Sequence, residues 1–149
     1  MTSAEQSDRR ARTPHLHQNA QRPQSALCVM PAAAAAVPTL RRLTRRLIEQ
    51  WHLPEEVGEA AALIVTELAA NVVRHSGSPE VALRITVGDG RVAVQVRDFG
   101  QWRSPRPRSG GAMAGGGRGL DLVGAFATGC EILSTGAGTR ATASIALPV

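Results

Sequence analysis

Two polar side chains interrupt an otherwise aliphatic stretch of the sequence, ELAANVVRH, at residues 67–75. Glu67 and Asn71 stand four residues apart, so on a helix they lie one turn apart and share a face. The aliphatic residues that can form the buried stripe beside them are Leu63, Ile64, Leu68 and Val72. A buried carboxylate without a partner is costly. The pair therefore either lines a wet pocket, where it can act on a ligand, or occupies a solvated helix edge.

A second candidate site is the sequence VRDFG, in which Asp98 and Gly100 follow a predicted strand. An aspartate at a strand end can accept a hydrogen bond from the exocyclic amine of a nucleobase, and glycine lets a ligand approach the backbone closely. An Asp-x-Gly sequence is also typical of an ordinary turn. Thr139 opens the last predicted strand, where its hydroxyl group can also lie near a base.

A third candidate site is the glycine cluster GGGRGL at residues 115–120, directly before a predicted helix. Glycines expose backbone N–H groups, and a helix N-terminus attracts phosphate. The cluster is not a P-loop, because no Lys-Ser or Lys-Thr follows it, and it does not open a βαβ unit as a dinucleotide fingerprint would. The alternative interpretation is the flexible end of a loop.

Hydrophobic periodicity predicts the elements that must position these residues. The predicted order is a strand at 25–32, helices at 33–51 and 53–76, a hairpin at 80–100 with its turn at 88–90, a loop at 101–117, a helix at 118–127 and a hairpin at 130–149. This order predicts an α+β two-layer sandwich, with helices on one face of a mixed or antiparallel sheet. The first strand is expected at an edge of that sheet.

Composition limits the class of protein. A length of 149 residues suits one domain, and the polar sequence of residues 1–24 is typical of a disordered tail, which leaves a domain at 25–149. No apolar run is long enough to span a membrane and no signal peptide is evident, so we expect a cytoplasmic location. Cys28 and Cys130 are interpreted as small buried hydrophobes.

Direct nucleic-acid binding is not expected, although the net charge is +5 and the 17 basic residues are all arginine. Aromatic residues make up only 3% of the chain, so the stacking platforms that bind single strands are missing. The basic residues are also scattered along the sequence. A solvated surface accounts for such a distribution of charge.

Taken in order, these motifs resemble those of the nucleotide-binding domain of the GHKL (histidine kinase/Hsp90-like) ATPase superfamily. The likeness covers residues 25–149, and the stretches TELAANVVRHSG and GGRGLDLV are similar to those of the anti-sigma-factor serine kinases. The resemblance implies a Bergerat-type ATP-binding fold. It also implies ATP and Mg²⁺ as cofactors, a sigma factor and an anti-sigma-factor antagonist as partner proteins, and a homodimer.

The resemblance assigns a role to each matching residue. Glu67 would be the general base that activates the attacking hydroxyl, and Asn71 would hold the Mg²⁺ that bridges the phosphates. Asp98 would accept a hydrogen bond from the adenine amine, with help from Thr139. The remaining residues implied to contact ATP are Arg74, His75, Gly100, Gly115, Gly117, Arg118, Gly119 and Leu120.

Two functions follow from the resemblance. The first is an ATP-dependent serine/threonine protein kinase that acts as an anti-sigma regulatory factor and phosphorylates an anti-sigma-factor antagonist. The second is a catalytically weak ATP-binding module that sequesters regulatory partner proteins. Trp102 motivates the second function, because it stands where the first glycine box usually has its second glycine.

Overall fold

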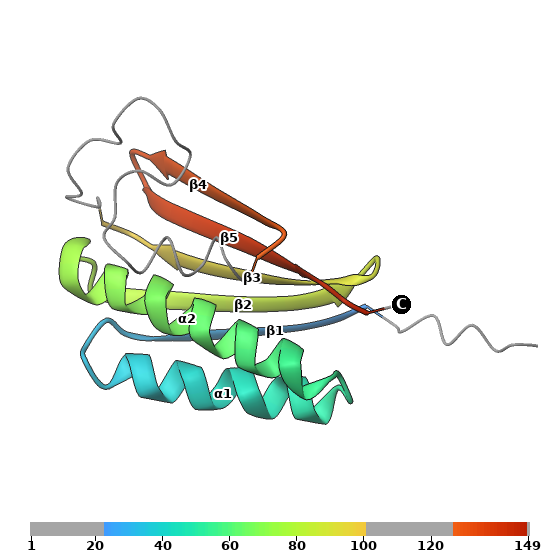
Figure 1. Cartoon of the computed structure of the whole chain (residues 1–149). Coiled ribbons are helices and arrows are strands. Elements are labelled where there is room, and N and C mark those ends of the chain that lie inside the picture. The colour runs from blue at the N-terminus through green and yellow to red at the C-terminus, as the bar shows by residue number, and fades with distance from the viewer. Residues whose placement is uncertain (1–22, 101–126, 149) are drawn as a thin grey trace, which may run out of the picture.

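The computed structural model of the chain describes residues 23–100 and 127–148 (Figure 1). Its elements, in chain order, are β1 (Gln24–Pro31), α1 (Ala36–Gln50), α2 (Glu55–His75), β2 (Glu80–Gly88), β3 (Arg91–Asp98), β4 (Gly129–Thr135) and β5 (Gly138–Ala146). All of these were predicted from the sequence, with ends that differ by a few residues. Ala127 is the only residue of the predicted helix at 118–127 that lies within the described part of the chain.

The strands form one five-stranded sheet in the order β1-β2-β3-β5-β4, and every pair of neighbours is antiparallel. Figure 1 shows α1 and α2 side by side on the same face of this sheet. The predicted α+β sandwich is therefore confirmed, with an antiparallel rather than a mixed sheet. The prediction that β1 is an edge strand is also correct, and β4 forms the other edge.

The core lies between the sheet and the two helices. The strands contribute the sheet side of this core, because apolar residues alternate along them. Every second residue of the central strands points toward the helices and is buried, as the pattern predicts. The buried strand residues of this layer are Val81, Leu83, Ile85, Val87, Val92, Val94, Val96, Ala141, Ala143 and Ile145. Because few core residues are aromatic, the layer is filled by branched aliphatic side chains.

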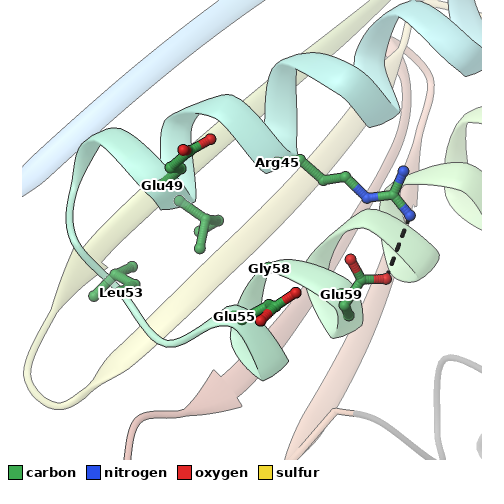
Figure 2. Close-up of a pocket in the computed structure, with 7 residues that line it drawn as sticks. Arg45, Glu49, Leu53, Glu55, Gly58 and Glu59 are labelled. Carbon is green, nitrogen blue, oxygen red and sulfur yellow. Dashed lines mark hydrogen bonds and ion pairs between the residues drawn. The ribbon is translucent and has the colours of Figure 1, made fainter.

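The two helices contact one another through a small residue. A Cβ atom on Gly58 would lie 3.2 Å from Cγ2 of Ile48, so this position of α2 has little room for a larger side chain. Figure 2 shows the end of this helix pair, where the guanidinium of Arg45 lies 3.3 Å from the carboxylate of Glu59 beside a cavity of about 420 Å³. Both charged side chains are largely exposed, so their ion pair adds little stability.

The turn between β2 and β3 uses two residues with positive φ, Asp89 at 52° and Gly90 at 72°. Two consecutive residues of this kind are typical of the hairpin turns whose twist matches that of the strands. The turn predicted at residues 88–90 is thus confirmed.

The two cysteines lie on opposite edge strands and point toward the core, but each is only half-buried. The prediction that they are buried was therefore too strong, because an edge strand has a neighbour on one side only. Partial burial still removes water from the Cys130 thiol and raises the pKa of Cys130 above its usual value. Within residues 23–100 and 127–148, no helix has both the length and the apolar composition needed to cross a bilayer.

Candidate functional site

The helix α2 presents Glu67 and Asn71 on the flank of its buried stripe. Leu68 and Val72, the residues that follow them, are buried against the sheet. The side chains of Glu67 and Asn71 are themselves half-buried. They lie neither in the core nor on a freely solvated surface, so the carboxylate and the amide remain accessible to a ligand while the helix holds them in place.

Asp98 is the most constrained polar residue of the site. It ends β3, has no exposed surface, and its Oδ1 accepts hydrogen bonds from the backbone N–H groups of Gly100 and Thr139, both at 3.1 Å. Two such bonds to one oxygen fix the orientation of the carboxylate. The bond from Thr139 also joins the end of β3 to the start of β5, although the two segments are about forty residues apart in the chain.

Two glycines bring three elements together around Asp98. A Cβ atom on Gly100 would collide with the carbonyl oxygen of Ser76, at the end of α2. A Cβ atom on Gly138 would collide with the carbonyl oxygen of Asp98, and the φ of Gly138 is 136°, which only glycine adopts easily. The end of α2, the end of β3 and the start of β5 therefore meet with backbone against backbone.

Two buried serines complete this junction. Oγ of Ser78 accepts the N–H of Phe99 at 3.1 Å and donates to the carbonyl of Glu80 at 2.7 Å. Oγ of Ser76 donates to the carbonyl of Val72 at 2.8 Å and accepts the N–H of Ser78 at 3.1 Å. The loop between α2 and β2 is thus tied both to the last turn of the helix and to the residue that follows Asp98.

Sequence reasoning missed three of these residues. The helix predicted at 53–76 ends just before Gly77, which has the positive φ of 63° expected after a helix. Ser76 and Ser78 flank that glycine, and their spacing gives no sign that one would reach β3. Gly138 lies inside the hairpin predicted at 130–149, and only its place directly before Thr139 could have marked it.

The other predicted residues lie around the junction or outside the described ranges. Arg74 and His75 are exposed on the last turn of α2. The hydroxyl of Thr139 is buried and lies 3.4 Å from Oγ of Ser134. The glycine cluster residues Gly115, Gly117, Arg118, Gly119 and Leu120, together with Trp102, fall outside the residues that the structure describes.

The junction has the chemical properties that a purine nucleotide requires. A carboxylate held by two amides can accept a hydrogen bond from an exocyclic amine, and glycine backbone beside it lets a flat base approach closely. Asn71 precedes Ser76 by five residues, roughly 8 Å along the helix axis. The amide of Asn71 is therefore displaced by about that distance along α2 from the end of the helix that meets Asp98.

A magnesium ion is compatible with the same set of residues. Mg²⁺ usually takes one or two protein oxygens and fills its octahedral shell with phosphate oxygens and water. The half-buried amide of Asn71 offers an oxygen of this kind, and the residues described here contain no cluster of three His, Cys, Asp or Glu side chains that would act as a separate metal cage.

With this geometry established, the chain can be placed among known proteins. It belongs to the histidine kinase-like ATPase domain family, whose model matches residues 30–145. The motifs that suggested this family from the sequence therefore identified it correctly.

Solved structures share the fold. The structure of the RsbU and RsbW domains of Rv1364c from Mycobacterium tuberculosis matches 83% of this chain with a TM-score of 0.67 and 20% identity. The Erythrobacter litoralis EL346 blue-light activated histidine kinase matches 64% at 27% identity with a TM-score of 0.51. A structure of the histidine kinase domain of that protein matches 79% at 22% identity with a TM-score of 0.52. This chain spans 32%, 32% and 62% of the three structures, respectively.

Proposed function

We propose that the chain is an ATP-dependent serine/threonine protein kinase that acts as an anti-sigma regulatory factor and phosphorylates an anti-sigma-factor antagonist. Family membership supports ATP binding in a regulatory protein. The motifs TELAANVVRHSG and GGRGLDLV, which resemble those of the anti-sigma-factor serine kinases, support the finer assignment. We assign this function to a domain at residues 25–149 in the cytoplasm, where sigma factors act.

One observation carries the proposal: α2 holds a half-buried carboxylate one turn before a half-buried amide, and the same helix ends against the fixed carboxylate of Asp98. Phosphoryl transfer depends mainly on positioning and on neutralising charge, with little covalent assistance from the protein. A single rigid helix that carries both the base and the metal ligand meets that requirement.

Each residue then has a defined task. The carboxylate of Asp98 accepts a hydrogen bond from the adenine amine and selects the base. The amide oxygen of Asn71 binds Mg²⁺, and the exposed guanidinium of Arg74 supplies positive charge near the phosphates. The carboxylate of Glu67 accepts the proton of the substrate serine hydroxyl, while the serine oxygen forms a bond to the γ-phosphorus of ATP. The bond between that phosphorus and ADP breaks, and ADP leaves. Bound ATP supplies the phosphoryl group that is transferred.

The test measures phosphoserine formation on a panel of purified anti-sigma-factor antagonists from the same organism, with ATP and Mg²⁺. We expect transfer by the wild-type chain, and a loss of about 10²- to 10⁴-fold in rate for Glu67→Gln, because the substitution removes the general base. Glu56→Gln is the matched control, since Glu56 is an exposed glutamate in the first turn of the same helix. Equal rates for Glu67→Gln and the wild type would show that Glu67 is not the base.

The second candidate function is a catalytically weak ATP-binding module that sequesters a sigma factor or another regulatory protein. Trp102 favours it, because this residue stands where the first glycine box of the family usually has its second glycine. Under this function the chain binds ATP with Mg²⁺ and binds its protein partner, but no antagonist becomes phosphorylated. The same assay, run together with an ATP-binding measurement, separates the two functions.

A further inference from the structure

The face of the sheet opposite α1 and α2 carries all the large hydrophobic side chains that are markedly exposed within the described ranges. These are Leu27 and Val29 on β1, Leu133 on β4 and Phe99 directly after β3, with exposed fractions from 41% to 57%. Because Cys28, Ile132 and Asp98 point toward the helices, their neighbours in the chain point to the other face. We call this surface the open face.

The open face is also positively charged. Four exposed arginines point outward from its strands, against two exposed glutamates; they are Arg84, Arg91, Arg97 and Arg140, with Glu80 and Glu131. Within the described part of the chain, none of these four arginines forms an ion pair with a carboxylate. The ion pair found there joins Arg45 to Glu59, on the helical side of the molecule. The positive charge on the open face is therefore not neutralised by these residues.

The charge is concentrated at one pair. Arg97 on β3 lies directly opposite Arg140 on β5, and Arg140 lies directly opposite Leu133 on β4. Like charges in opposite positions on neighbouring strands repel one another and destabilise the sheet. A cleft of about 130 Å³ opens here, lined by Arg97, Leu133, Thr135, Gly138, Thr139 and Arg140. An anionic group in this cleft would relieve the repulsion between the two arginines.

The outer groove between α1 and α2 differs from the open face in its charge. It is lined by Arg41 and Arg45 but also by Glu56 and Glu59, so its charges balance. Among the surfaces formed by residues 23–100 and 127–148, only the open face combines an excess of arginine with exposed aliphatic side chains.

We propose that the open face is a docking surface for an acidic protein segment, with an aspartate or glutamate carboxylate between Arg97 and Arg140 and a neighbouring aliphatic side chain on Leu133. A second copy of the chain is a poorer occupant, because two faces with the same excess of positive charge would meet. Nucleic acid would neutralise the arginines but would leave the aliphatic side chains without an apolar partner. The cleft shares Gly138 and Thr139 with the junction around Asp98, but the docking proposal uses the outward-pointing Arg97, Arg140 and Leu133 and does not depend on the proposed kinase chemistry.

The experiment selects binders from a displayed library of short random peptides, using the full chain as bait. Two double variants accompany the wild type: Arg97→Gln/Arg140→Gln on the open face, and Arg42→Gln/Arg46→Gln as a control with the same change in net charge on exposed positions of α1. Circular dichroism and thermal melting establish that each variant is folded. Dissociation constants of the enriched peptides are then measured at two salt concentrations.

We expect the enriched peptides to carry an acidic residue beside an aliphatic one. Their affinity should fall by about tenfold or more for the open-face variant, because a charged partner is lost, and should stay near the wild-type value for the helix control. Their affinity should also weaken at higher salt. Enriched peptides without acidic residues, or peptides that bind both variants equally, would overturn the proposal.

Two further results would overturn it in favour of another occupant. A DNA or RNA oligonucleotide that binds the open face more tightly than any peptide, and is lost in the open-face variant alone, would assign the surface to nucleic acid. A concentration-dependent dimer in analytical ultracentrifugation that dissociates only in the open-face variant would assign it to a second copy of the chain.

Discussion

At the scale of single residues, Asp98 has two roles that point substitutions can separate. Its Oδ1 accepts two backbone N–H groups, which holds the strand ends together, and its carboxylate reads the base in the proposed function. An asparagine has an oxygen that can accept the same two N–H groups, but its NH₂ group is a donor and cannot accept the adenine amine. An alanine removes both roles.

We therefore expect Asp98→Asn to keep the fold and to lose the discrimination of ATP from GTP. Asp98→Ala should lose about 1–3 kcal/mol of stability for the N–H groups left buried without an acceptor. Urea denaturation measures the stability, and competition binding with the two nucleotides measures the discrimination. If Asp98→Asn still prefers ATP as strongly as the wild type does, another group reads the adenine.

At the scale of elements, the sequence predicted the local structure well and the junction poorly. The alternation of apolar and polar residues in 80–98 predicted both strands of the hairpin, because each strand buries one face. The Gly-Asp-Gly sequence at 88–90 predicted the turn, in which Asp89 and Gly90 have positive φ. The contacts of Gly138 with Asp98 and of Ser78 with Phe99 join segments that are distant in the chain. No local pattern records them, because the first contact requires β5 to lie beside β3 and the second requires β2 to pair with β3.

The junction itself is testable through Gly138. Gly138→Ala places a Cβ atom against the carbonyl of Asp98 in a backbone conformation that alanine rarely adopts, so we expect a loss of about 1–3 kcal/mol in the free energy of unfolding. Gly129→Ala, at the start of β4, is the control, because a Cβ atom there meets nothing within 4 Å and φ is unexceptional. Equal stability of the two variants in chemical denaturation would mean that the backbones do not meet this closely.

At the scale of the whole molecule, two layers share one core, and the site lies where the helix layer ends against the sheet. Leu68 is completely buried beneath the helix that carries Glu67 and Asn71. The packing of Leu68 therefore holds α2, with Glu67 and Asn71, in place against the sheet, and it also contributes to the stability of the whole domain.

Leu68→Ala should cost about 2–5 kcal/mol, a large fraction of the roughly 5–15 kcal/mol that stabilises a domain of this kind. Leu27→Ala makes the same chemical change on the open face, where the side chain is 57% exposed, and should change stability by only about 0.5 kcal/mol or less. Thermal unfolding monitored by circular dichroism distinguishes them. Similar losses in the two variants would contradict the assigned position of the core.

The proposed function requires that one site binds ATP through Asp98 and its metal ion through Asn71. Titration calorimetry with ATP, in the presence and absence of Mg²⁺, measures both properties in the wild type, Asn71→Ala and Asp98→Asn. We expect tight, metal-dependent binding by the wild type, binding that no longer responds to Mg²⁺ in Asn71→Ala, and loss of adenine preference in Asp98→Asn. Wild-type affinity and metal dependence in both variants would show that these two residues do not form the ATP site.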